Sequence, residues 1–184
     1  MIVFLDFEAS SLGKRGFPVE VGWIFEDGRT ENHLIRPAPE WDEWSDEAEA
    51  IHGLSRERLA REGEPHDAVA RRMVKVLADH DLYASAPSWD GQWLSRLLRA
   101  AGLPRHALRL RDTEEARRDA ALTALRAAGL DPAAHDPLLA EVLEAVAREG
   151  RAANPAHRAV EDARREMDLW RGIPARVARA LRAG

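Results

Sequence analysis

Apolar and polar residues follow two patterns along this chain, and each pattern predicts one kind of secondary structure. Short apolar runs rich in Val, Ile and Phe are typical of buried strands, and the chain opens with one that leads directly into Asp6. Asp27-Gly28 separates two further runs and predicts a hairpin turn. We therefore expect strands at the start of the chain and at residues 19–25, 30–36, 82–86 and 108–111.

Apolar residues spaced three or four positions apart predict the helices. We expect them at residues 46–51, 65–80, 91–101 and 111–150. Ser55 suits the N-cap of another short helix, and Asn154 with Pro155 predicts the cap and first position of a later one. The order of strands and helices indicates one mixed sheet with helices packed against it.

The first strand contains an electrostatic conflict. Asp6 and Glu8 are two positions apart, so both side chains project from the same face of the strand. Two carboxylates at that distance repel each other, and burial makes their ionisation costlier still. The pattern therefore requires a compensating positive group.

Two later segments place acidic residues beside predicted elements. Asp90 stands between a predicted strand and the next helix, where the alternative role is that of a helix N-cap. Asp162 borders the apolar stripe of the helix that follows Asn154. His157 precedes Asp162, and taken alone it would be a polar residue in the first turn of that helix.

Four carboxylates on three elements suit a divalent metal centre. Hard cations such as Mg²⁺ prefer oxygen ligands and keep positions for water and phosphate. A pair of such ions would resolve the repulsion and could clamp both oxygens of an in-line phosphoryl displacement. A histidine beside them could accept a proton from water, because its ordinary pKa is near neutral.

Three motifs make the chain resemble the DEDDh 3′–5′ exonucleases, the family of proofreading subunits, oligoribonuclease and RNase T. Asp6-Phe7-Glu8 matches the D-x-E motif, and Trp89-Asp90 matches the aromatic-Asp motif after a strand. The third motif, H-x-A-x-x-D, matches His157, Ala159 and Asp162. Residues 18–22 and 51–55 resemble further family segments, so the resemblance extends from residue 2 to about residue 170.

The resemblance implies an RNase H-like α/β fold, with a five-stranded mixed sheet, helices on both sides and an extra helical segment before the last motif. It implies that Asp6, Glu8, Asp90 and Asp162 hold two Mg²⁺ or Mn²⁺ ions, with His157 as the general base. The implied reaction removes nucleoside 5′-monophosphates from the 3′ end of single-stranded DNA or RNA.

The chain also departs from the family pattern. The segment after Glu8 reads Ala9-Ser10-Ser11-Leu12 and lacks the usual glycine before the apolar residue. The residues before Asp90 contain neither the usual His nor the usual Asn. We expect Leu12, Phe17 and Trp89 to line the pocket for the 3′ nucleotide, although each also suits the hydrophobic core.

Composition sets the wider limits. The length of 184 residues favours a single domain at residues 1–184, with a core at about 2–170 and a basic C-terminal helix at 171–184. The net charge of −5 disfavours a protein that coats nucleic acid nonspecifically. The sequence contains no cysteine, no apolar stretch of membrane length and no basic segment before the first strand. We therefore expect a cytoplasmic protein without a secretory signal.

Two other classes remain open. One is a protein-docking or nucleic-acid-binding module with little hydrolysis, which could dock through the acidic segment 40–49 with Trp41 and Trp44. Alternatively, these two Trp side chains cover the edge of the sheet. A phosphatase acting on small molecules would use the same metal chemistry. The presence of all five motif residues favours the exonuclease.

Overall fold

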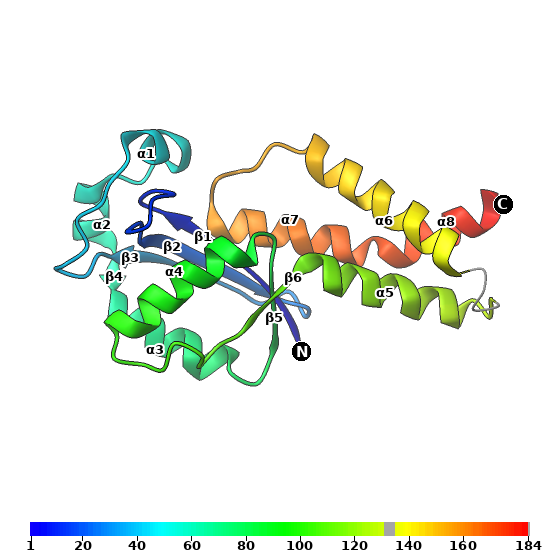
Figure 1. Ribbon diagram of the computed structural model, residues 1–184, viewed down its shortest axis with the longest axis horizontal. Coiled ribbons are helices and arrows are strands. Elements are labelled where there is room, and N and C mark those ends of the chain that lie inside the picture. The colour runs from blue at the N-terminus through cyan, green and yellow to red at the C-terminus, as the bar shows by residue number, and fades with distance from the viewer. Residues whose placement is uncertain (131–134, 184) are drawn as a thin grey trace.

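The computed structural model of the chain describes residues 1–130 and 135–183. It shows an elongated molecule, with the sheet and helices α1 to α4 at one end and a helical extension at the other (Figure 1). The strands are β1 (Ile2–Ala9), β2 (Pro18–Phe25), β3 (Thr30–Arg36), β4 (Glu64–Pro65), β5 (Asp81–Ala84) and β6 (Leu110–Asp112). The helices are α1 (Asp46–His52), α2 (Arg56–Glu62), α3 (His66–Leu77), α4 (Pro87–Ala100), α5 (Thr113–Ala127), α6 (His135–Ala152), α7 (Ala159–Arg171) and α8 (Ile173–Ala183).

The strands form one mixed sheet in the order β4-β3-β2-β1-β5-β6. β1 pairs with β2 in antiparallel and with β5 in parallel orientation, so it lies inside the sheet. In this register Asp6 lies opposite Gly22 and Glu8 lies opposite Glu20. The acidic end of β1 is thus paired with β2, whereas β5 pairs only with Ile2 to Phe4.

Helices cover both faces of the sheet, and alternate residues of β1 show which helices cover each face. Val3, Leu5 and Phe7 belong to the main core, which includes side chains of α3 and α4. Phe4 belongs to a separate cluster with Ala163 and Met167 of α7. Asp6 and Glu8 share the parity of Phe4, so they face α7.

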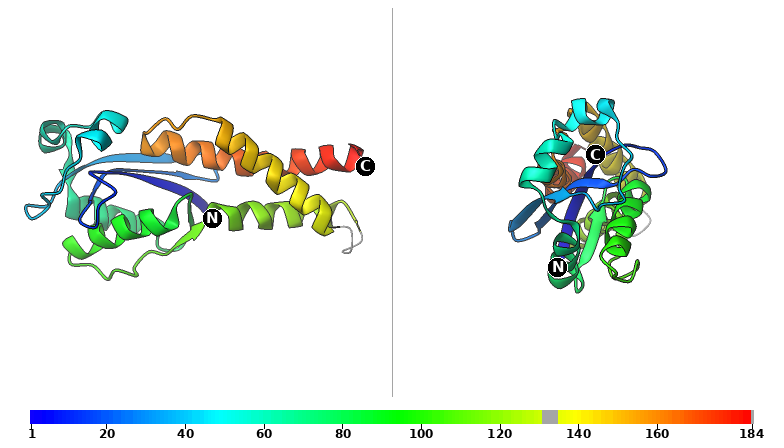
Figure 2. Two further views of the ribbon diagram at one scale, coloured as in Figure 1. Left: turned by 45° about the horizontal axis from the view of Figure 1, so that its top comes forward. Right: turned by 90° about the vertical axis from the view of Figure 1, so that its left-hand side faces the viewer.

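The helical extension has its own core. Leu125 of α5, Val142 and Val146 of α6 and Val177 of α8 are buried together there. Leu169 joins this cluster from α7, so α7 runs from the sheet into the extension, as Figure 2 shows. Among the described helices, none is both long enough and apolar enough to cross a membrane.

Several predicted boundaries are correct for the predicted reason. Ser45 and Ser55 cap α1 and α2 by accepting hydrogen bonds from backbone N–H groups, and Gly53 ends α1 in the left-handed conformation. The hairpin between β2 and β3 turns at Gly28, whose φ is 93°. The RNase H-like architecture with helices on both faces is also observed, but with six strands instead of five, since two residues after α2 form β4.

Other boundaries were wrong. α4 begins at Pro87 rather than at residue 91, so Asp90 lies inside its first turn and Ala86 takes the N-cap position. α7 begins at Ala159 rather than at Pro155, because Arg158 has an extended backbone. The expected helical segment 111–150 begins at residue 113, after β6, and is divided into α5 and α6; its residues 131–134 lie outside the described part of the chain.

Candidate metal centre and active site

Three carboxylates from two elements meet at one end of the sheet. Oxygen atoms of Asp6 and Glu8, on β1, and of Asp162, on α7, lie within 4.8 Å of one another. The close approach of α7 depends on Gly22, the residue paired with Asp6, because a Cβ atom there would lie 2.3 Å from the backbone nitrogen of Val160. A glycine on β2 therefore allows the carboxylate of Asp162 to reach those of β1.

Asp90 approaches from the first turn of α4. Its side chain is buried, with 1% of the residue exposed, and its Oδ2 atom has no hydrogen-bond partner within the described structure. The charge of Asp90 is the main cause, after burial, of the raised pKa of Asp6. Asp90 is outside the group of three that lie within 4.8 Å of one another, but its charge acts on Asp6 and Glu8, so it is a fourth carboxylate near this group.

Burial and mutual repulsion raise the pKa values of this cluster. The pKa of Asp6 lies well above its ordinary value, first because of burial and then because of Asp90 and Glu8. Burial, together with the charge of Asp162, raises the pKa of Glu8 to about 7, and burial raises that of Asp90 to about 7. Without a cation, the cluster therefore keeps part of its protons near neutral pH.

The donor set fits divalent cations. All four side chains offer only carboxylate oxygens, which are the ligands preferred by Mg²⁺ and Mn²⁺. Asp90 Oδ2 is buried and unpaired, and such an oxygen is costly unless a cation or a proton satisfies it. The protons held by Asp6, Glu8 and Asp90 near neutral pH are the ones that a bound cation would displace.

His157 lies in the loop before α7 with a left-handed backbone, at a φ of 53°. It is the only non-glycine residue with positive φ in the described part of the chain, and its side chain is partly exposed. The adjacent loop is tied to the carboxylate cluster, because Ala156 N donates to Asp162 Oδ1 over 3.1 Å. Strained backbone that the surroundings hold in place is a frequent feature of functional sites.

An ion pair fixes the other side of His157. Arg158 Nη2 donates to Oε1 of the fully buried Glu20 over 2.6 Å, and Arg158 Nε lies 3.1 Å from Oε2. Asn32 and the backbone nitrogen of Ala159 also donate to Glu20. Burial alone would raise the pKa of Glu20, but the hydrogen bonds from Arg158 and Asn32 lower it overall. His157 is thus held between two anchored neighbours.

Two residues beside the site were missed by the sequence argument. His52 is buried at the end of α1; its Nδ1 accepts from Leu54 N over 3.0 Å, and its Nε2 has no partner within the described structure. Burial lowers its pKa, and His157 is among the charges that act on it. The family-like segment 51–55 was a signal for it. Arg165 Nη1 lies 3.4 Å from Asp162 Oδ1, and no pattern in the sequence singled it out.

The expected nucleotide-pocket residues differ in exposure. Phe17 is fully buried and stacks on Trp41 with ring centroids 5.2 Å apart, so it occupies the core, which was the alternative for this residue. Leu12 is 69% exposed and Trp89 is 37% exposed. Only Leu12 and Trp89 therefore present a surface on which a base could stack.

The two tryptophans of the acidic segment 40–49 contribute to the fold. Trp41 is 5% exposed, and Trp44 Nε1 donates to Glu49 over 2.8 Å while its ring packs on the main core. The aromatic part of the alternative docking surface is therefore largely covered by this chain itself.

No family model and no curated protein matches the chain. Solved structures of exonuclease I do match. The zinc-bound complex of Escherichia coli exonuclease I with single-stranded DNA has a TM-score of 0.68 at 18% identity, over 99% of this chain and 42% of that one. The E. coli enzyme with a dT13 oligonucleotide has a TM-score of 0.67 at 16% identity, over the same 99% and 42%. A product-bound exonuclease I has a TM-score of 0.64 at 15% identity, over 99% and 45%.

The chain thus spans less than half the length of these exonucleases. At such identities the likeness concerns the fold: the protein has the RNase H-like fold of exonuclease I, as the sequence led us to expect.

Proposed function

We propose that this chain is a metal-dependent 3′–5′ exonuclease that removes terminal nucleotides from single-stranded nucleic acid. The observation that carries the proposal is the meeting of Asp6, Glu8 and Asp162, with Asp90 beside them, at one end of a sheet with the exonuclease I fold. The matching exonuclease I structures include complexes with single-stranded DNA.

The four carboxylates would hold two Mg²⁺ or Mn²⁺ ions. When bound, such ions supply positive charge beside the attacked phosphate and the departing 3′ oxygen. Asp6 and Glu8 would bind from β1, Asp90 from α4 and Asp162 from α7, so the cation site would require all three elements to be assembled.

His157 acts as the general base. It accepts a proton from the attacking water, whose oxygen forms a new bond to phosphorus while the bond from phosphorus to the 3′ oxygen breaks. The departing 3′ oxygen takes up a proton, and a nucleoside 5′-monophosphate is released. The role of Glu20, Arg158 and Ala156 is to hold the His157 loop in place rather than to touch the substrate.

A 5′-labelled oligonucleotide tests this function directly. We expect single-stranded DNA or RNA to shorten stepwise from the 3′ end with Mg²⁺ or Mn²⁺, and the shortening to stop when EDTA is added. Asp162→Asn should abolish the ladder, whereas Asp79→Asn, at an exposed position, should leave it unchanged. Shortening from the 5′ end, or in chelator, would refute the proposal. Release of phosphate from small monoesters without any ladder would identify the phosphatase alternative.

A further inference from the structure

One groove of the molecule has no role in the chemistry described so far. It lies between the loop that joins β1 to β2 and one side of α4, and has a volume of about 350 Å³. Its polar lining consists of Lys14, Ser88, Gln92, Ser95, Arg96 and Arg99.

The lining is positively charged in a chain whose net charge is −5. It contains three basic side chains and no acidic residue. Within the described structure, neither Lys14 nor Arg99 forms an ion pair with a carboxylate. The nearby Glu43 is not part of the lining; it accepts a hydrogen bond from Ser11 and lies 3.7 Å from Arg15, which also pairs with Asp42. The groove therefore attracts anions.

Arg96 gives the groove a fixed shape. Its Nη1 donates to the backbone oxygen of Arg15 over 2.7 Å, and its Nη2 donates to that of Lys14 over 2.9 Å. This two-point contact ties the loop to α4. Lys14 and Arg99 remain exposed on the two sides of the groove.

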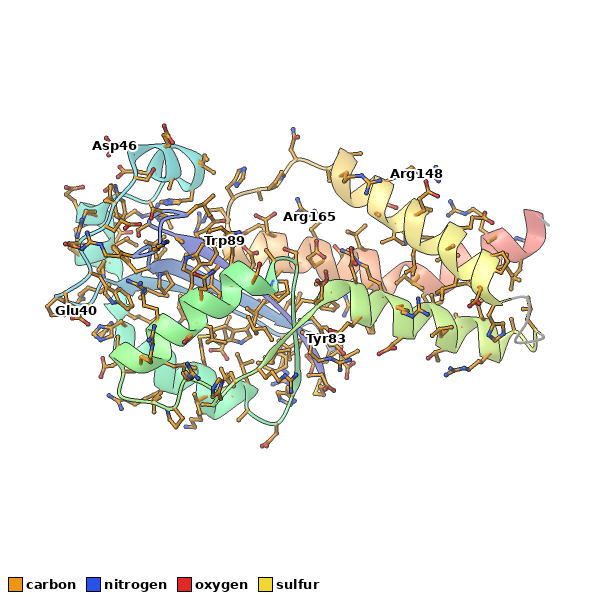
Figure 3. All side chains as sticks on the ribbon, in the orientation of Figure 1. Glu40, Asp46, Tyr83, Trp89, Arg148 and Arg165 are labelled. Atoms are coloured by element: carbon orange, nitrogen blue, oxygen red, sulfur yellow. The ribbon has the colours of Figure 1, made fainter. Side chains whose placement is uncertain are left out.

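The groove shares two elements with the carboxylate cluster, since its residues lie along α4 and the loop after β1, while Asp90 lies on the buried face of α4. Ser88 lies two residues before Asp90 in α4, and the loop follows the acidic end of β1. Trp89 stands at the N-terminal end of α4, as Figure 3 shows, and stacks on Trp93 with ring centroids 6.0 Å apart. From Ser88 to Arg99 the helix rises by about 16 Å, which corresponds to about five stacked nucleotides of one strand.

We propose that this groove binds the phosphodiester backbone of single-stranded nucleic acid upstream of the 3′ end, and so prefers oligonucleotides over dinucleotides. The inference rests on the proposed exonuclease function. Lys14 and Arg99 contact successive phosphates, and the exposed ring of Trp89 offers a stacking surface between the groove and the site. Arg96 holds the loop and so shapes the groove.

The test compares substrate lengths in the double variant Lys14→Ala/Arg99→Ala. Cleavage of dT12 should fall on the order of tenfold in kcat/KM at 0.1 M NaCl, because affinity for a single strand scales with salt to the power of about −0.7 per phosphate contact. The log–log salt slope should become less negative by about 1.4 for two lost contacts. Cleavage of the dinucleotide pTpT should stay within about twofold, since it does not reach both side chains.

The control is Lys75→Ala/Arg118→Ala, which removes the same charges from exposed positions on α3 and α5. It should leave both substrates and the salt slope unchanged. An equal loss for dT12 and pTpT, or no loss for either, would overturn the groove proposal while leaving the exonuclease function intact.

A binding measurement separates this proposal from the proposed function. Fluorescence anisotropy of labelled dT12 in EDTA requires no hydrolysis, and the groove variant should bind more weakly than wild type and the control. If wild type binds dT12 but never shortens it, the exonuclease proposal fails while the groove stands. If the three proteins bind dT12 equally, the groove proposal is wrong, whatever the cleavage assay shows.

Discussion

Glu8 and Glu20 face each other across β1 and β2, and their environments show how single residues define the site. Glu20 is fully buried, yet its pKa is lowered because Arg158 and Asn32 donate to it. The pKa of Glu8 is raised to about 7, because burial and the charges of Asp162 and Glu20 outweigh that of Arg158. The protein thus supplies the positive charge of Arg158 to Glu20, while Glu8 has no such partner of its own and, in the proposed function, would be paired by a metal ion.

Asp6→Asn tests the origin of this repulsion without any substrate. The variant should melt at a higher temperature than wild type in EDTA, because it removes a charge that burial and four acidic neighbours disfavour. Wild type should gain about 2.7 kcal/mol from Mn²⁺ at a hundredfold excess over Kd, with each kcal/mol worth about 2–4 °C. The variant should lose most of that gain.

Thermal melts of wild type, Asp6→Asn and the exposed control Asp79→Asn, each in EDTA and in Mn²⁺, decide the matter. If Asp6→Asn lowers the melting temperature in EDTA and keeps the metal response, Asp6 serves as a structural hydrogen-bond acceptor. The assignment of the metal site would then be wrong.

His157→Ala tests the proton acceptor. Its kcat should fall by about 10²–10⁴, the range of a general base, while the Mn²⁺-induced rise in melting temperature persists. The acid limb of the pH–rate profile should also lose its histidine component. Arg164→Ala, an exposed change on α7, serves as the control. A His157→Ala enzyme with unchanged kcat would reduce His157 to a loop residue.

At the scale of elements, the site depends on how closely α7 approaches β2. Gly22→Ala would place a Cβ atom 2.3 Å from the backbone of Val160, and backbone atoms cannot move aside as a flexible side chain can. We expect a loss of about 1–3 kcal/mol in unfolding free energy, together with a weaker Mn²⁺ response, because Asp162 moves with α7.

Gly91→Ala is the matched control for Gly22→Ala. Gly91 lies within α4, and nothing lies within 4 Å of the position of its Cβ. This change should stabilise the protein by about 0.5–1 kcal/mol. Urea unfolding of both variants provides the comparison, and an unaltered Gly22→Ala protein would show that α7 can shift without cost.

The elements also show which parts of the site a sequence can predict. The shared direction of the Asp6 and Glu8 side chains follows from the two-residue period of a strand. The position of Asp162 beside the core follows from its place next to the apolar stripe of its helix. The left-handed backbone of His157 and the extended backbone of Arg158 follow no such period, and Arg158 is held by Glu20, 138 positions away in the sequence. Local capping rules favoured Asn154 and Pro155, and this long-range ion pair gave α7 a later start.

At the scale of the whole molecule, the carboxylate cluster makes stability depend on pH. Glu8 and Asp90 have pKa values raised to about 7 from ordinary values of 4.5 and 3.8. Between these values the folded form holds more protons than the unfolded form. The stability that protonated Glu8 and Asp90 contribute is therefore fully present below their ordinary pKa values and is lost as the pH rises through about 7.

Asp90→Asn isolates this effect. In EDTA, the unfolding free energy of wild type should fall more steeply between pH 5 and pH 8 than that of Asp90→Asn, which has no proton to lose at this position. Urea titrations at four pH values measure the two slopes. Equal slopes would show that Asp90 does not titrate in this range. In a separate titration, Mn²⁺ should flatten the slope of wild type, because the bound ion displaces the protons.

α7 belongs to both cores, since Ala163 and Met167 pack on the sheet while Leu169 packs in the helical extension. We therefore expect full opening of the extension to disturb the helix that carries Asp162, so that the two ends of the molecule share one cooperative unit of local unfolding. We expect cations bound at the sheet to slow hydrogen exchange of the backbone amides of α6 and α8, at the far end of the molecule, because every opening that releases those helices would also cost part of the binding free energy.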